Sequence, residues 1–117
     1  NRTWAEDAAV LVTLVSKQTF DHNDEPARTH SFDTGAAWQN LALEATRRNL
    51  VAHAMQGFDY EAAAEQLGVP DEFAVECMIA VGDRAPAATL PDDLQERESP
   101  NGRKPIGEIL HQGGFAD

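Results

Sequence analysis

One unbroken apolar and β-branched run, residues 8–15, constrains the fold of this chain more than any other segment. A run of strand length without polar alternation is typical of a strand that is covered on both faces, so we expect a central strand here. Residues 73–82 form a second apolar run and predict another, mostly buried strand. Helix-forming segments separate these two runs along the chain.

The principal helix is predicted over residues 36–48, which are rich in helix formers and carry apolar side chains near the helical period. Asp33 suits the N-cap of this helix, because its side chain can accept a hydrogen bond from the first free amides. Asn49 suits the left-handed residue that often ends a helix. Before this helix, residues 21–30 turn polar and predict a surface loop.

A glycine turn is predicted between a short extended piece, residues 50–55, and a second helix over residues 60–67. Asp59 is the expected N-cap of this second helix, and Gly68 is expected to terminate it. Gly57 therefore lies just before a helix start, where backbone amides can be offered to the polar edge of a ligand. An ordinary helix-entry loop is the alternative interpretation.

Arg103 and Lys104 stand together after a strongly acidic stretch, residues 59–98, that includes a predicted brief helix over residues 91–97. Prolines and a glycine bound the loop that carries the pair, which restricts its geometry. Two adjacent cations in such a loop can hold an anion such as a phosphate. The alternative is a solvated pair that serves only solubility.

The formal net charge of −11 disfavours nucleic acids and anionic membranes as partners, because like charges repel their phosphates. The sequence has neither a bilayer-spanning apolar run nor the features of a signal peptide, so we expect a cytoplasmic protein. Cys77 is the only cysteine, which excludes an intrachain disulfide and fits a reducing compartment. The four histidines lack metal-ligand spacing, and we expect no metal site.

Seven short motifs, taken in order, resemble the C-terminal half of the FMN-dependent nitroreductases. Each motif is weak alone, but their common order and family-like gaps make the resemblance specific, and it covers nearly all of the chain. The motifs are Asn1 with Trp4-Ala5, Asp33-Thr34-Gly35-Ala36-Ala37 with Gln39-Asn40-Leu41, Leu50-Val51-Ala52-His53, Gly57-Phe58-Asp59, Leu67-Gly68-Val69-Pro70, Ile79-Ala80-Val81-Gly82 and Arg103-Lys104-Pro105.

The resemblance implies an α+β fold with a mixed, largely antiparallel sheet and helices around it. Residues 1–117 would be the C-terminal part of a single nitroreductase-like domain, because nothing here resembles the family's N-terminal, flavin-binding portion. We interpret the chain, which begins at Asn1 without an initiator methionine, as part of a longer enzyme. The fold would then be incomplete without its N-terminal half.

The resemblance further implies a homodimer with FMN at the subunit interface, reduced by NAD(P)H and oxidised by a nitro, quinone or reactive carbonyl acceptor. The backbone of Met55, Gln56 and Gly57 would face the isoalloxazine ring, and Arg103 would bind the phosphate. Lys104 is a weaker phosphate candidate, because it points the opposite way in an extended segment. No catalytic side chain is expected, because the flavin carries out the redox chemistry. The alternative is a non-enzymatic dimerisation or binding module that retains part of the fold without flavin.

Overall fold

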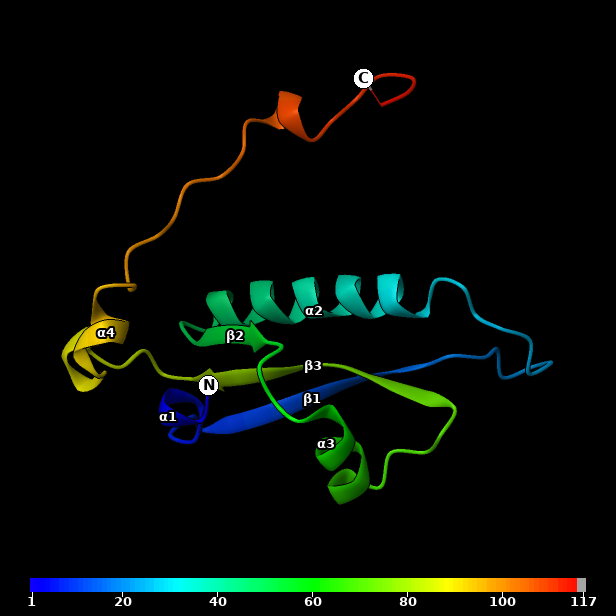
Figure 1. The fold of residues 1–117 in the computed structure, drawn as a ribbon, viewed down its shortest axis with the longest axis horizontal. Helices are drawn as coiled ribbons and strands as arrows, with labels where there is room; N and C mark the ends of the chain where they lie inside the picture. Colours follow the sequence, from blue (N-terminus) through cyan, green and yellow to red (C-terminus); the bar gives the residue numbers. More distant parts are fainter. Residues whose placement is uncertain (116–117) are drawn as a thin grey trace. The chain divides into compact units, whose positions relative to one another are not determined.

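The computed structural model describes residues 1–115, which belong to two compact units that divide after Ala85. The first unit holds a three-stranded antiparallel sheet with helices, and this arrangement confirms the predicted α+β class (Figure 1). Its elements are α1 (Arg2–Ala5), β1 (Val10–Lys17), α2 (His30–Arg47), β2 (Val51–Met55), α3 (Tyr60–Leu67) and β3 (Phe73–Gly82). Of the helices in residues 1–115, none is long and apolar enough to cross a membrane.

The sheet has the order β1-β3-β2, and both outer strands pair antiparallel with β3. β3 spans the predicted residues, and its Ile79 is completely buried at the centre of the sheet. The prediction of a central strand over residues 8–15 is wrong in position. Within the described residues β1 lies at an edge and begins at Val10, which is 53% exposed, because β3 takes a partner on each side.

A β-bulge interrupts the pairing of β1 with β3. Leu14 lies opposite Cys77 and the next residue, Val15, lies opposite Val75, so Glu76 is the extra residue on β3. A bulge turns a side chain away from the regular alternation of the strand. Glu76 is thereby available to side chains at the start of α2, as described below.

α2 begins at His30 rather than at residue 36, and its N-cap is Thr29 rather than Asp33. Asp33 lies in the first turn, where its carboxylate accepts a 3.2 Å hydrogen bond from the Thr29 hydroxyl. The predicted polar loop is correspondingly shorter, because its last residue already belongs to the helix. At the other end, Asn49 has the predicted left-handed backbone, with φ of 60°.

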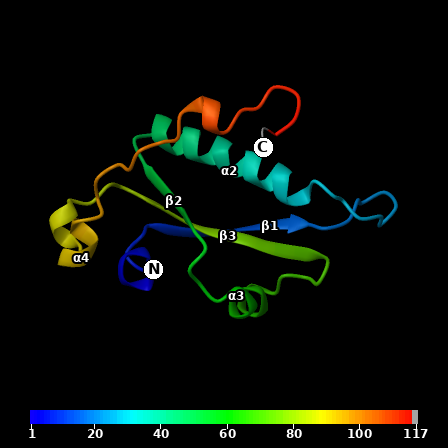
Figure 2. The same cartoon turned by 45° about the horizontal axis from the view of Figure 1, so that its top comes forward.

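α2 and α3 lie on opposite sides of the sheet (Figures 1 and 2). α3 has the predicted bounds, and its N-cap Asp59 accepts a 2.9 Å hydrogen bond from the amide of Ala62. Gly68 ends the helix in the left-handed conformation, with φ of 62°. Both capping predictions for α3 are therefore confirmed.

The second unit begins at Pro86 and contains short helical turns. They are a 3₁₀ turn (Ala87–Thr89), α4 (Asp92–Gln95) and a second 3₁₀ turn (Ile106–Glu108). α4 is shorter than the predicted residues 91–97, and Pro91 is its N-cap. Gln95 closes this segment on itself by donating a 2.7 Å hydrogen bond to the carbonyl of Leu90.

Candidate cofactor-binding site

Three predicted site residues, Met55, Gln56 and Gly57, form one turn between the end of β2 and the start of α3. Met55 is the last residue of β2, and its side chain is buried in a cluster with Ala5 and Ala80. Gln56 and Gly57 are exposed. Met55 therefore anchors the turn to the core, and this turn can meet a ligand through its backbone and through Gln56.

Two backbone amides in this turn are available to a ligand. In residues 1–115, the amides of Gln56 and Gly57 have no hydrogen-bond acceptor within the protein. The Phe58 amide, in contrast, donates a 3.0 Å hydrogen bond to the Gln56 carbonyl and closes the turn. Adjacent free N–H groups match the acceptor atoms at the polar edge of an isoalloxazine ring, so this turn fits the group that the sequence resemblance implies.

The space beside Gly57, rather than its backbone angles, sets this glycine apart. Its φ lies outside the left-handed region, in contrast to that of Gly68. A Cβ at position 57 would come within 2.7 Å of Asn1 Nδ2, which also donates a 3.3 Å hydrogen bond to the Gly57 carbonyl. Asn1 therefore touches the turn directly, a contact that sequence reasoning did not predict.

Arg103 and Lys104 lie in the second unit, and both are exposed. The Arg103 guanidinium donates 3.2 Å hydrogen bonds to the carbonyls of Asn101 and Gly102 and also bonds the side-chain oxygen of Asn101. These contacts fold the guanidinium back on its own loop, while further N–H groups can still meet an anion. Joint binding of one ligand by this loop and by the Gly57 turn stays a prediction.

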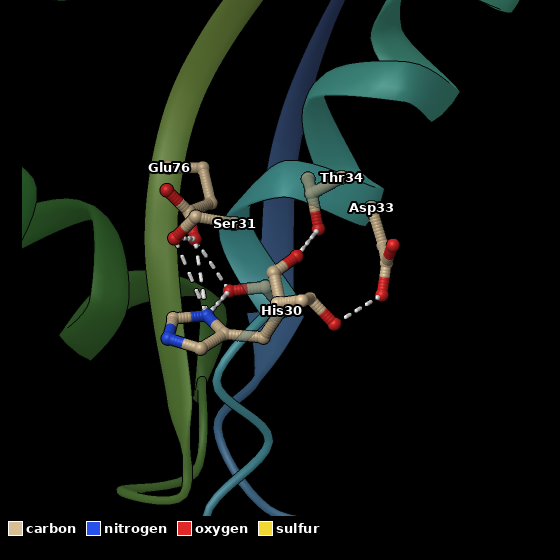
Figure 3. A network of polar contacts seen from close by, with 7 residues as sticks. His30, Ser31, Asp33, Thr34 and Glu76 are labelled. Carbon is tan, nitrogen blue, oxygen red and sulfur yellow. Dashed lines mark hydrogen bonds and ion pairs between the residues drawn. The ribbon is translucent and has the colours of Figure 1, made fainter. Parts of the chain in front are cut away.

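Sequence analysis did not predict a polar cluster at the first turn of α2, formed by Ser16, His30, Ser31 and Glu76. Figure 3 shows its side chains, which come from α2, β1 and β3. The Glu76 carboxylate accepts hydrogen bonds of 2.5 Å from Ser16 and 2.6 Å from Ser31. His30 Nδ1 lies 2.8 Å from Ser16 Oγ and 3.4 Å from the same Glu76 oxygen. The cluster thus joins the start of the helix to two strands.

The hydrogen-bond pattern fixes the proton on His30. Ser16 and Ser31 each donate their single hydroxyl proton to Glu76, so the Ser16–His30 hydrogen bond needs a proton on Nδ1. Burial raises the pKa of Glu76, but the two serine hydrogen bonds and the His30 charge outweigh it and lower that pKa overall. The arrangement satisfies every member of the cluster and is that of a structural tie. Among residues 1–115, no three histidine, cysteine or acidic side chains are grouped to hold a metal ion.

Comparison with known proteins identifies relatives over most of the chain. The model of the Nitroreductase family matches residues 1–83. An uncharacterized 15.4 kDa protein in the ask 5' region of Mycolicibacterium smegmatis is 33% identical over 116 residues, which cover 98% of this chain and 77% of the relative. Protein DrgA of Synechocystis sp. is 36% identical over 76 residues, or 65% of this chain and 34% of the relative.

Solved structures share the fold. A crystal structure described as an oxidoreductase containing FMN superposes with a TM-score of 0.93 at 40% identity, over 99% of this chain and 60% of its own. A nitroreductase family protein of Clostridium difficile has a TM-score of 0.66 at 17% identity, over 95% of this chain and 63% of its own, and shows likeness of fold alone. The chain thus spans less than two thirds of the length of each of these two structures.

Proposed function

The chain belongs to the nitroreductase family, and on that premise we propose that it is the C-terminal part of a flavin oxidoreductase domain that binds FMN. The main support is its 40% identity, over 99% of its length, to a solved oxidoreductase described as containing FMN. The two free amides at Gln56 and Gly57 provide independent support, because they offer donors where the fold ends a strand beside a helix start.

The chemistry that FMN supplies when bound is the transfer of reducing equivalents from NAD(P)H to a nitro, quinone or reactive carbonyl acceptor. The chain contributes binding and orientation. The amides of Gln56 and Gly57 would donate hydrogen bonds to the polar edge of the ring, and the buried Met55 side chain holds the turn that carries them. Arg103 would bind the phosphate, with Lys104 as a second cation. No side chain of this chain needs to exchange a proton in this scheme.

The proposed assembly is a homodimer with FMN at the subunit interface, located in the cytoplasm. The net charge of −11 disfavours nucleic acids as partners, because phosphate contacts supply most of their affinity for proteins. The acceptor is a small molecule that approaches the same face of the flavin as NAD(P)H. Arg103 and Lys104 would form a local cationic pair in an acidic chain, which favours an anionic group there.

A flavin titration of the purified protein tests this proposal. We expect a visible flavin absorption band with the protein and turnover of NADH or NADPH with a quinone or nitro acceptor. Replacing Arg103 with Ala should raise the FMN dissociation constant about tenfold to a hundredfold, since a charged hydrogen bond is lost. Arg97→Ala, which removes an equal charge from the same unit, is the matched control and should change it little.

The opposite results would contradict the proposal. A colourless protein that stays dimeric with excess FMN would favour a binding or dimerisation module without flavin. Equal losses for Arg103→Ala and Arg97→Ala would show that only the overall charge matters and would remove Arg103 from the site.

A further inference from the structure

We propose that residues 1–5, here called the clamp, position the two free amides, with Asn1 and Trp4 as positioning residues. The inference rests on the proposed function for its ligand, FMN, but not for its geometry. The clamp consists of α1 and its N-cap Asn1, and it touches the chain on both sides of Gln56. Its role is to hold the turn in one conformation before any ligand arrives.

The first half of the clamp is apolar. Ala5, Met55 and Ala80 are each less than a tenth exposed and form a buried cluster, against which Trp4 packs. The centroid of the Trp4 ring also lies 4.7 Å from that of the His53 ring on β2. α1 therefore covers the end of β2 directly before Gln56, and burial of these apolar groups favours this position of the strand end.

The second half is polar and lies on the other side of Gln56. The Asn1 carboxamide donates its 3.3 Å hydrogen bond to the Gly57 carbonyl. The backbone carbonyl of Asn1 accepts hydrogen bonds from the amides of Trp4, at 3.2 Å, and Ala5, at 3.0 Å. The same helical turn thus sets the positions of Asn1 and of the two residues that pack on Met55, so the two halves act together.

The clamp leaves the two amides as the free backbone polar groups of Gln56 and Gly57. The carbonyl of Gln56 accepts from Phe58 and that of Gly57 accepts from Asn1, so both carbonyls are already engaged. A ligand that accepts hydrogen bonds from Gln56 and Gly57 meets donors whose orientation is already fixed. Such preorganisation strengthens binding because less conformational freedom is lost on association.

A double-mutant cycle between Asn1→Ala and Gly57→Ala tests the clamp, with two readouts. The first is hydrogen exchange of the Phe58 amide in protein without FMN, and the second is the FMN dissociation constant. Loss of the Asn1 hydrogen bond should speed Phe58 exchange and raise the dissociation constant, each about fivefold. The urea midpoint of global unfolding should stay unchanged, because Asn1 is exposed.

Gly57→Ala should speed Phe58 exchange and raise the FMN dissociation constant by a similar factor, because its Cβ would displace the Asn1 carboxamide. The double variant should be no worse than either single one, because Asn1→Ala removes the atom that the new Cβ would meet. Gly35→Ala is the control glycine, since a Cβ there meets nothing within 4 Å. It should neither change Phe58 exchange nor couple to Asn1→Ala.

The clamp is overturned if Phe58 exchange is the same with and without the Asn1 side chain, or if the effects of Asn1→Ala and Gly57→Ala simply add. A protein that binds no FMN would refute the proposed function separately, because the exchange cycle is measured without ligand. Flavin binding with an uncoupled cycle would refute the clamp and leave the proposed function intact.

Discussion

The Ser16 hydroxyl donates a 2.5 Å hydrogen bond to Glu76, and this contact joins the edge strand β1 to the bulged position of β3. Ser16 is 4% exposed and is the buried polar side chain of the described residues. Because it also meets His30 Nδ1, one hydroxyl links both strands to the first turn of α2. The start of this helix is therefore held by tertiary contacts that lie outside its own sequence.

Ser16→Ala should lower the free energy of unfolding by about 1–3 kcal/mol, because the substitution leaves partners of the buried hydroxyl unsatisfied. Urea unfolding measures the change. Thr46→Ala is the control, since the Thr46 hydroxyl bonds only the Ala42 carbonyl of its own helix at an exposed position. If Ser16→Ala lowers the free energy of unfolding no more than the control does, the cluster does not stabilise the fold.

Acid should weaken this tie through Glu76. The pKa of Glu76 lies below its ordinary value of 4.5 in the folded protein, so its contribution is complete above pH 4.5 and is lost as pH falls through the folded pKa. The stability difference between the wild type and Glu76→Gln should therefore shrink as pH falls below 4.5. Urea unfolding between pH 7 and pH 3 measures it, with Glu65→Gln on the exposed face of α3 as control. A difference that stays constant over this range would contradict the assignment.

Asp59→Ala should destabilise the protein by about 1 kcal/mol, since α3 loses the side-chain oxygen that accepts from the Ala62 amide. Asp59→Asn should retain most of the stability, because an amide oxygen caps a helix as well. Glu61→Ala removes an equal charge from the first turn without removing the cap and serves as the control in urea unfolding. Equal losses for Asp59→Ala and Glu61→Ala would show that charge rather than capping decides.

Two glycine substitutions should change the stability of the protein in opposite directions. Gly68→Ala should cost about 1 kcal/mol, because its φ of 62° is unfavourable for a residue with a Cβ. Gly35→Ala should stabilise by up to about 1 kcal/mol, because it lies inside α2 with open space around the new methyl group. Thermal unfolding of the two variants checks the pair, and a shift in the same direction for both would contradict the backbone argument.

Comparing Gln56→Pro with Gln56→Ala distinguishes an FMN contact made by the Gln56 backbone amide from one made by its side chain. Gln56→Ala keeps the free amide and should change FMN affinity less than about threefold. Gln56→Pro removes that amide, which bonds nothing else in the described residues, and should weaken FMN binding about tenfold. Fluorescence titration with FMN measures both, and the urea midpoint of each variant without ligand shows whether the fold survives. Stronger loss for Gln56→Ala than for Gln56→Pro would assign the contact to the side chain.

Local sequence signals predicted the elements whose ends are set by local chemistry. Asp59 and Gly68 mark the ends of α3, and Asn49 marks the left-handed residue after α2, because capping and positive φ depend on the residue itself. The start of α2 could not be predicted in this way. His30 and Ser31 begin that helix through contacts with Ser16 and Glu76, which are distant in sequence.

The position of β1 in the sheet was also beyond local reasoning. An apolar run shows that a segment is a strand but not which neighbours it has, and pairing with β3 placed this strand at an edge. In the candidate site, Gly57 and its neighbours were predicted as a turn because a glycine before a helix cap is a local signal. The contact with Asn1 was not, since nothing in either residue type specifies the other.

The central claim is that the amides of Gln56 and Gly57 face bound flavin. Its most direct test is the change in amide ¹H and ¹⁵N chemical shifts when FMN is added to the isotope-labelled protein. We expect large shifts for the amides of Gln56 and Gly57 and little change for that of Gly68 at the far end of α3. Bound flavin with unshifted Gln56 and Gly57 amides would contradict it.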